Sequence, residues 1–249
     1  MDIIWLLQGS FLLVAAGYRL AVDPYVSHFV EQRDGVTRLA PPPLAAAALR
    51  PDFIYCTHHH IDHLDPAGLP QILAGAPPGC RLAGPASVAA TCATLGITGA
   101  ETVRIGVPFT AGPFTLTPVK AFHSDPAATG LLIGIEGRLI YLSGDTEWRD
   151  ELPALILKAA GRAPDLVIIC INGRWGNMDA AQAVETIRKL GARAAIPMHY
   201  GLFAENTADP AGFLKDCTAA GIRAIALEPG KSVDLNTLVP HQPRTVRQE

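Results

Sequence analysis

Residues 57–65, THHHIDHLD, hold four of the chain's eight histidines and two of its aspartates within nine positions. Imidazole nitrogens and carboxylate oxygens are common ligands of divalent metal ions. In an extended chain, alternate residues share a face, so His58 and His60 can hold one metal together while His59 points away. Once the chain turns, Asp62 and His63 can supply a carboxylate and an imidazole to a second metal. The spacing therefore predicts half of a two-metal site.

The remaining ligands must come from other parts of the chain, because four ligands cannot complete two sites. Three suitable residues stand at the ends of predicted strands: His123 after FTLTPVKAF, Asp145 at the end of IYLSGD, and His199 after AAIPM. Taken singly, a histidine after a strand more often makes only hydrogen bonds. The histidine cluster together with three such strand ends favours a metal site over a solvated polar loop.

The strands that position these residues belong to an alternation of strands and helices. Apolar runs bounded by glycine and proline predict a β-meander over residues 3–25, strands at 52–57 and 114–122, and a hairpin over 130–145. Further strands are expected at 165–171, 193–197 and 222–227, and helices at 150–160, 179–190 and 209–220. A terminal strand and a loose end containing His241 follow residue 231. We expect a single α/β domain over residues 1–249, since no repeat or linker is evident.

Composition narrows the classes of function. Hydrophobic residues make up 49% of the chain and charged residues 17%, with a net charge of −3, which permits a sizeable core and offers no basic patch for nucleic acid. Polar residues and glycines interrupt the apolar N-terminal stretch, so neither a signal peptide nor a membrane span is expected. Five widely spaced cysteines without a CxxC pair predict reduced thiols in a cytoplasmic protein.

The motif His58-x-His60-x-Asp62-His63, followed by His123, Asp145 in SGDT and His199 in PMHY, resembles the metallo-β-lactamase superfamily. The resemblance covers nearly the whole chain. The strings THHHIDHLDP, CINGRWGNM and PMHYGLFAENTADP further resemble the branch that contains L-ascorbate 6-phosphate lactonase. This resemblance implies a four-layer αβ/βα sandwich of two mixed sheets, with metal ions held at one edge between the sheets.

The resemblance also implies a ligand set. The first metal would be held by His58, His60 and His123. The second would be held by Asp62, His63 and His199, and Asp145 would bridge the two. A set without cysteine is compatible with Mn²⁺, Zn²⁺ or Fe²⁺, and the lactonases of this branch are associated with Mn²⁺. A homo-oligomer is implied as well.

Two metals roughly 3.5–4 Å apart can share a water and lower its pKa from near 16 toward about 7, so that hydroxide is available at neutral pH. We expect this hydroxide to attack an ester or lactone carbonyl. Asp62 would orient the water, and Tyr200 could donate a hydrogen bond to the oxyanion, although a tyrosine here could equally serve packing.

For the substrate we expect a small anionic group, bound by Asn172 and Arg174 of the NGR string. A turn-forming Asn-Gly and a solvated arginine would explain these residues equally well. Asn206 is a further candidate for substrate binding, although helix capping would also account for it and for Thr207. The remaining possible anion contacts also fit ordinary surface charges: Arg33, Arg38 and Lys120.

These features predict a metal-dependent hydrolase of a small anionic lactone or ester, such as a phosphosugar-acid lactone of the L-ascorbate 6-phosphate type. A metal-dependent phosphodiesterase is the alternative within the same superfamily, and the acidic charge balance counts against it. A non-catalytic metal-binding subunit belongs to a different class. Such a subunit would not need a complete ligand set with a bridging carboxylate.

Overall fold

Two seven-stranded sheets form the centre of the molecule in the computed structural model, which describes residues 1–240. The first sheet has the order β14-β1-β2-β3-β4-β5-β6 and the second β13-β12-β11-β10-β9-β8-β7. The strands of the first are β1 (Asp2–Trp5), β2 (Phe11–Ala15), β3 (Tyr18–Val22), β4 (Phe53–Tyr55), β5 (Arg81–Gly84), β6 (Glu101–Thr102) and β14 (Ser232–Asp234). Those of the second are β7 (Phe109–Ala111), β8 (Phe114–Lys120), β9 (Thr129–Ile135), β10 (Arg138–Leu142), β11 (Leu166–Cys170), β12 (Ala194–Met198) and β13 (Arg223–Ala224).

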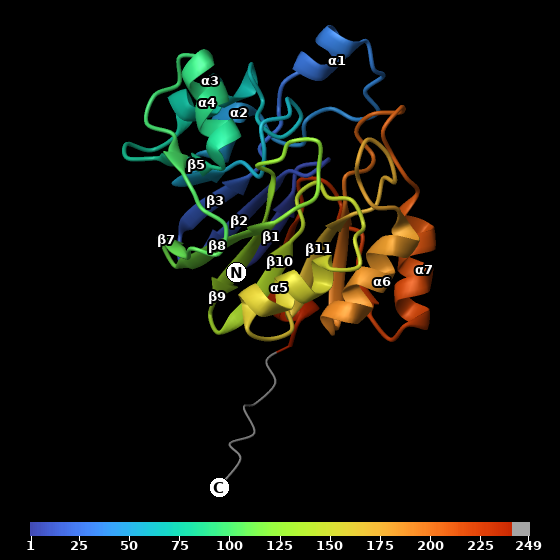
Figure 1. The fold of residues 1–249 in the computed structure, drawn as a ribbon. Coiled ribbons are helices and arrows are strands. Elements are labelled where there is room, and N and C mark those ends of the chain that lie inside the picture. Colours follow the sequence, from blue (N-terminus) through green and yellow to red (C-terminus); the bar gives the residue numbers. More distant parts are fainter. Residues whose placement is uncertain (241–249) are drawn as a thin grey trace, which may run out of the picture.

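Helices cover the outer faces of both sheets, which gives four layers (Figure 1). The first sheet is covered by α2 (Ala46–Leu49), α3 (Gly68–Gly75) and α4 (Ala86–Thr94). The second is covered by α5 (Leu152–Ala160), α6 (Ala180–Leu190) and α7 (Pro210–Ala219). Two short helices lie at the periphery, α1 (Phe29–Asp34) and α8 (Leu235–Leu238). Both sheets contain parallel and antiparallel pairs, so the expected αβ/βα sandwich of mixed sheets is confirmed.

The apolar pattern of the strands accounts for the layers. In β2, Phe11 and Leu13 enter the core between the sheets, whereas Leu12 enters a separate core with Leu69 and Ile72 of α3. Successive side chains of a strand point to opposite faces, so an unbroken apolar run requires cover on both sides. Each such side chain contributes about 1.5–3 kcal/mol on burial.

Most predicted elements are present, with shifted ends. The hairpin consists of β9 and β10 and turns at Glu136 and Gly137, which have φ values of 50° and 76°. The strand expected over 114–122 ends at Lys120. Ala121 N donates to Ala128 O at 3.4 Å, and residues 122–127 loop out between these two residues.

The strand predicted over 222–227 is wrong in length, since only Arg223–Ala224 is a strand. The chain leaves this edge to reach the first sheet, where Gly230 N donates to Trp5 O at 2.8 Å. The predicted terminal strand is β14. His241 lies outside the described residues. Within residues 1–240, no helix combines the length and apolar character needed to cross a membrane.

One edge of the sandwich collects the carboxyl ends of several strands. β3 runs parallel to β4, and β10 runs parallel to β11, which is parallel to β12. Cross-sheet hydrogen bonds join the two sheets at this edge: Thr129 N donates to Thr57 O at 3.0 Å, and Tyr55 Oη lies 2.8 Å from Thr129 Oγ1. Residues that follow these strands are therefore brought together from distant parts of the sequence.

Candidate metal centre and substrate cleft

The first group of predicted ligands consists of three histidine rings whose nitrogens converge. His58 Nε2 lies 3.0 Å from His60 Nδ1, and His123 Nε2 lies 3.1 Å from the same atom. His58 and His60 follow β4 on the segment that starts at Thr57, and His123 follows β8. The three nitrogens are close enough to serve one metal ion together.

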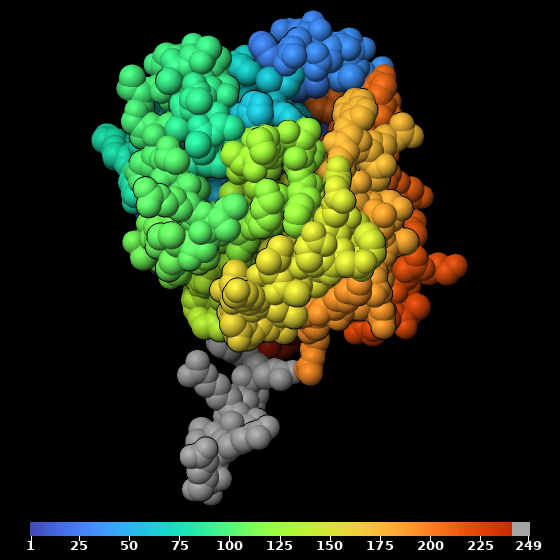
Figure 2. Space-filling model, viewed as in Figure 1, coloured from blue at the N-terminus to red at the C-terminus, as the bar shows by residue number. Residues whose placement is uncertain are grey.

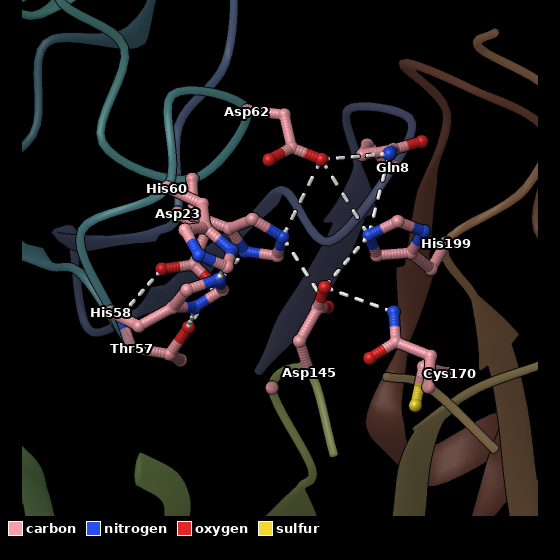
Figure 3. Close-up of polar contacts among 12 residues, drawn as sticks. Gln8, Asp23, Thr57, His58, His60, Asp62, Asp145, Cys170 and His199 are labelled. Carbon is pink, nitrogen blue, oxygen red and sulfur yellow. Dashed lines mark hydrogen bonds and ion pairs between the residues drawn. The ribbon is translucent and has the colours of Figure 1, made fainter. Parts of the chain in front are cut away.

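The second group faces the first across a carboxylate. The ligand atoms of Asp62, His63 and His199 lie close together. Asp62 Oδ2 is 3.6 Å from His199 Nε2 and 3.7 Å from His63 Nε2. Asp145 follows β10 and stands between the groups: its Oδ1 is 3.3 Å from His63 Nε2, and its Oδ2 is 3.1 Å from His199 Nε2 and 3.8 Å from His123 Nε2. Figure 3 shows Asp62 and Asp145 approaching from opposite sides, with His199 on one flank and His58 and His60 on the other.

Hydrogen bonds on the far side of three rings leave the facing nitrogens free to bind metal. His58 Nδ1 lies 3.0 Å from Thr57 Oγ1, whose proton goes to Asp23. His123 Nδ1 lies 3.1 Å from the carbonyl oxygen of Gly176. His63 Nδ1 lies 2.8 Å from Asp23 Oδ2. Because each outer nitrogen has only an acceptor available, it carries a proton, and in the neutral ring the inner Nε2 keeps a lone pair.

Unpaired buried atoms give a direct test of whether a metal fits. Among the described residues, His63 Nε2 and Asp145 Oδ1 are fully buried, make no hydrogen bond and face each other at 3.3 Å. Leaving such groups unpaired costs about 1–3 kcal/mol each. A divalent cation would accept electron pairs from both atoms, so the donor set fits a metal.

The electrostatics of the cluster favour positive charge at its centre. Burial, together with the neighbouring His63, holds the pKa of His58 well below its usual range, so the ring is neutral. Burial alone would raise the pKa of Asp145, but His199 and His63 hold it well below its usual range. For His63, the opposing effect of burial is outweighed by Asp145, Asp62 and Asp23, and its pKa is raised. The carboxylates therefore create a potential that attracts positive charge.

Strained backbone concentrates at this site. Eight non-glycine residues of the described chain have left-handed φ, and five of them line or adjoin the cluster: Leu7 (74°), Gln8 (50°), Asp23 (47°), Trp175 (51°) and His199 (66°). Each such residue costs on the order of 1–3 kcal/mol and persists where the surroundings fix it. His199, for example, is held by its N–H donating to Gln8 O at 3.0 Å.

A cleft of about 370 Å³ opens beside the cluster and includes His60 and Asp62 in its lining. Its other walls come from α1 and the residues after it, from Phe203 and Asn206, and from Trp175 of the loop between β11 and α6. Asp62 is open to this space, with 18% of its side chain exposed, and His60 is partly exposed as well, whereas the His63 side chain is fully buried.

Of the predicted substrate-binding residues, Asn172 and Asn206 lie together, whereas Arg174 lies outside the cleft. Asn172 Nδ2 donates to Asn206 Oδ1 at 2.8 Å, and both side chains are buried, with Asn206 reaching the cleft. Arg174 is exposed, lies outside the cleft lining, and extends toward Glu205 O at 3.5 Å. Tyr200 packs against Trp5 with the rings tilted by 33° and their centroids 4.7 Å apart, and burial raises its pKa to about 12. Its contact with an oxyanion stays a prediction.

His59 points away from the metal ligands, as expected. Its Nδ1 lies 2.6 Å from Asp125 Oδ2, and the same oxygen accepts from Ser87 Oγ at 2.6 Å. The five cysteines are free thiols, four of them buried, and none belongs to the ligand groups of the described chain. Burial raises the pKa of Cys170 to about 12.

The further basic residues and Thr207 have structural partners. Arg38 is largely buried, pairs with Glu31 and lies over the rings of Tyr25 and Phe203. Lys120 Nζ donates to Pro126 O at 3.2 Å, and Thr207 Oγ1 accepts from Gly201 N at 2.8 Å. Arg33 lines the cleft and sits 3.4 Å from Asp34.

Comparison with known proteins identifies the family. A family model described as "Beta-lactamase superfamily domain" matches residues 18–200, a range that contains every predicted metal ligand. The chain belongs to this superfamily. Among curated members, the UPF0173 metal-dependent hydrolase of Methanosarcina barkeri is 31% identical over 251 residues, covering 94% of this chain and 99% of the relative. The corresponding protein of Methanosarcina mazei is 28% identical and covers 94% and 99%. This chain is therefore a member of a family of metal-dependent hydrolases.

Solved structures agree with the superfamily fold. A metallo hydrolase from Ignicoccus hospitalis superposes with a TM-score of 0.71 at 22% identity, covering 93% of this chain and 97% of that one. At this identity the likeness concerns the fold alone.

Three residues that contact the candidate ligands carried no functional assignment from the sequence. Asp23 binds His63 and Thr57, and Gln8 Nε2 donates to Asp62 Oδ2 at 2.9 Å. Asn177 Nδ2 donates to Asp145 Oδ2 at 2.9 Å. Asp23 directly follows β3, so the criterion that found the metal ligands, an acidic residue at a strand end, would have found it too.

Proposed function

We propose that this chain hydrolyses a lactone or ester with two divalent metal ions held by the clustered histidines and aspartates. The observation that carries the proposal is the convergence of His58 Nε2, His60 Nδ1 and His123 Nε2 within 3.0–3.1 Å contacts, next to the unpaired His63 Nε2 and Asp145 Oδ1. A polar loop without metal would instead turn such atoms toward hydrogen-bond partners or water.

One ion would be held by His58, His60 and His123, the other by Asp62, His63 and His199, with Asp145 between them. A nitrogen and carboxylate donor set suits Mn²⁺ or Zn²⁺, and also Fe²⁺. When bound, two such ions supply Lewis acidity and make water reactive near neutral pH.

The residues of the chain contribute position and proton handling. Asp62 reaches the cleft and is held by Gln8, so its carboxylate can orient a water against a bound carbonyl and accept the proton that the water loses. Oxygen from water adds to the carbonyl carbon, the bond to the ester oxygen breaks, and that oxygen takes a proton. Tyr200 remains the proposed donor to the oxyanion.

The proposed substrate is small and carries an anionic group, as in a phosphosugar-acid lactone of the L-ascorbate 6-phosphate type. Arg33 at the cleft and the Asn172–Asn206 pair support this proposal, and Arg174 would have to reach in from outside. We also propose that residues 1–249 form a single domain and that the chain assembles into a homo-oligomer.

The test uses untagged protein, stripped of metal and reloaded with Mn²⁺ or Zn²⁺, against neutral lactones, phosphorylated lactones and phosphodiesters. Metal-restored lactone opening is the expected result. Cleavage of phosphodiesters alone would overturn the proposal in favour of a phosphodiesterase. Bound metal without hydrolysis of any ester would favour a non-catalytic subunit.

A further inference from the structure

The cleft beside the metal ligands has walls that are mainly apolar. Its apolar lining consists of Val30, Val36, Ile61, Trp175 and Phe203. These side chains come from the segment around α1, the histidine-rich segment, the loop between β11 and α6, and the segment after β12. In Figure 2 the blue segment that contains α1 and the gold segment between β11 and α6 adjoin at the surface. A group bound here would touch apolar surface on several sides.

The charges around the cleft do not favour a charged group deep inside it. Its only cationic Lys or Arg is Arg33, which lies at the surface with 59% of its side chain exposed, 3.4 Å from Asp34. Asp34 and Asp62 add two carboxylates to the lining. Since an unpaired buried anion is costly, an anionic substituent that does not reach the metal ions could bind only at the outer rim beside Arg33.

Packing within the protein does not explain the exposure and the backbone conformation of Trp175. The residue is 65% exposed, the largest exposed fraction among the large hydrophobic residues of the described chain, and its φ is 51°. A bulky residue in this conformation is strained, and an exposed tryptophan gains little from burial to offset the strain.

The neighbours of Trp175 hold it in place through the metal ligands. The carbonyl oxygen of Gly176 binds His123 Nδ1 at 3.1 Å, and Asn177 binds Asp145 at 2.9 Å. A Cβ on Gly176 would lie 3.0 Å from His123 Nδ1, so the loop follows the ring closely. The position of Trp175 at the cleft is thus set by the same loop that orients two ligands.

We infer that this cleft binds an uncharged, apolar substituent of the substrate and that Trp175 is its specificity-determining wall. The inference rests on the proposed hydrolysis of a lactone or ester and concerns the group next to the scissile bond: an alkyl or aryl chain stacked on Trp175, in place of the hydroxylated chain of a sugar-acid lactone. A free anionic group of the substrate then lies at the rim by Arg33 and outside the apolar part.

A series of γ-butyrolactones tests the inference, because the reacting ring stays constant while a 5-alkyl chain grows from methyl to hexyl. In the metal-loaded wild type, kcat/KM rises by about fourfold for each methylene that the cleft buries. A matched lactone with a 5-carboxylate shows no such gain. The ratio of kcat/KM between the hexyl and methyl lactones falls about tenfold or more in Trp175→Gly.

The variants separate a binding role from a structural one. Glycine accepts left-handed φ without strain, so Trp175→Gly keeps the melting temperature and the metal content of the wild type. Trp175→Phe retains an aromatic ring and restores part of the chain-length dependence. Ile105→Ala is the control, since Ile105 is 50% exposed and lies outside the cleft lining, and it leaves the dependence unchanged.

Binding of 5-alkyl-2-pyrrolidinones, amide analogues of the same lactones, keeps the test independent of turnover. Their Kd, measured by calorimetry, falls with chain length in the wild type and not in Trp175→Gly. If this pattern holds while no lactone is opened, the inference stands and the proposed hydrolysis fails. If lactones are opened but neither kcat/KM nor Kd depends on chain length, or if Trp175→Gly keeps the dependence, the inference is wrong.

Discussion

Asp23 Oδ2 lies 2.8 Å from His63 Nδ1, and both side chains are completely buried. The same carboxylate accepts hydrogen bonds from the backbone N–H and the hydroxyl of Thr57, at 2.6 and 2.7 Å. One aspartate after β3 therefore fixes the ring proton of His63 and the start of the histidine-rich segment. An outer partner of this kind sets both the orientation and the basicity of a metal ligand.

Asp23→Asn should weaken metal binding although it removes no ligand. The amide can donate toward His63 Nδ1, which would favour the wrong tautomer and turn the ring proton toward the metal side. We expect metal affinity to fall by about 10- to 100-fold, measured by competition with a chromophoric chelator.

Asp165→Asn is the matched control, because Asp165 also accepts a backbone N–H, that of Leu139 at 2.7 Å, and pairs with Arg162 outside the cluster. Equal metal affinity in wild type and Asp23→Asn, with the fold intact by circular dichroism, would contradict the tautomer argument.

Asp145→Asn should remove the link between the two ligand groups. The amide keeps the shape of the side chain but loses the charge that faces His63 at 3.3 Å and His199 at 3.1 Å. We expect at most one tightly bound metal per chain, and a loss of hydrolysis larger than about 100-fold, the upper range for outer-shell changes. Asp150→Asn, at a side chain that is 79% exposed, serves as the control. Two metals retained by Asp145→Asn would count against a bridging position.

Gly9→Ala should displace His63 by direct contact. A Cβ on Gly9 would lie 2.7 Å from His63 Cε1, closer than carbon atoms pack, and His63 is already fixed by Asp23. Overpacking of this kind costs about 1–3 kcal/mol, so we expect metal affinity to fall by about tenfold or more. In the control Gly134→Ala, the new Cβ meets its nearest neighbour, Thr115, at an ordinary 3.5 Å. An unchanged metal affinity in Gly9→Ala would show that the site tolerates movement of His63.

Glu31 should contribute a pH-dependent stability to the wall of the cleft. Burial alone would raise its pKa, but hydrogen bonds from Arg38, His28 and Tyr25 lower the pKa from 4.5 to about 2. A lowered pKa stabilises the fold above pH 4.5, and this contribution is lost as the pH falls from about 4.5 to 2.

Glu31→Gln should therefore lower the free energy of unfolding by about 2 kcal/mol at neutral pH, and the difference from wild type should vanish near pH 2. Urea titrations at several pH values measure this difference. Glu185→Gln breaks a surface pair with Arg188 and should have little effect at any pH. A gap between wild type and Glu31→Gln that does not close in acid would contradict the pKa argument.

The cluster of candidate metal ligands was predictable because its signal is local. Alternate histidines followed by Asp62-His63 form one short string, and His123, Asp145 and His199 each directly follow an apolar run. Strand direction then brings these ends to one edge, which the sheet topology of β4, β10 and β12 confirms. The two-sheet fold was predictable through the resemblance that these same residues carry.

The outer partners and the cleft depend on contacts that the sequence does not reveal. Asp23 stands at a strand end, as the candidate metal ligands do, but nothing in the sequence shows that it pairs with His63, which is far along the chain. The left-handed backbone of Trp175 follows from how its neighbours bind His123 and Asp145, since no local pattern demands it. Arg174 belongs to the same loop but lies outside the cleft, a difference that only the loop conformation decides.

The most direct test of the metal centre is the number of metal ions bound per chain. Untagged protein, purified and then reloaded with Mn²⁺ or Zn²⁺, is analysed for bound metal by elemental analysis after excess metal has been removed. The seven clustered ligands predict close to two ions per chain. A folded chain that stays free of metal after reloading would contradict the metal centre.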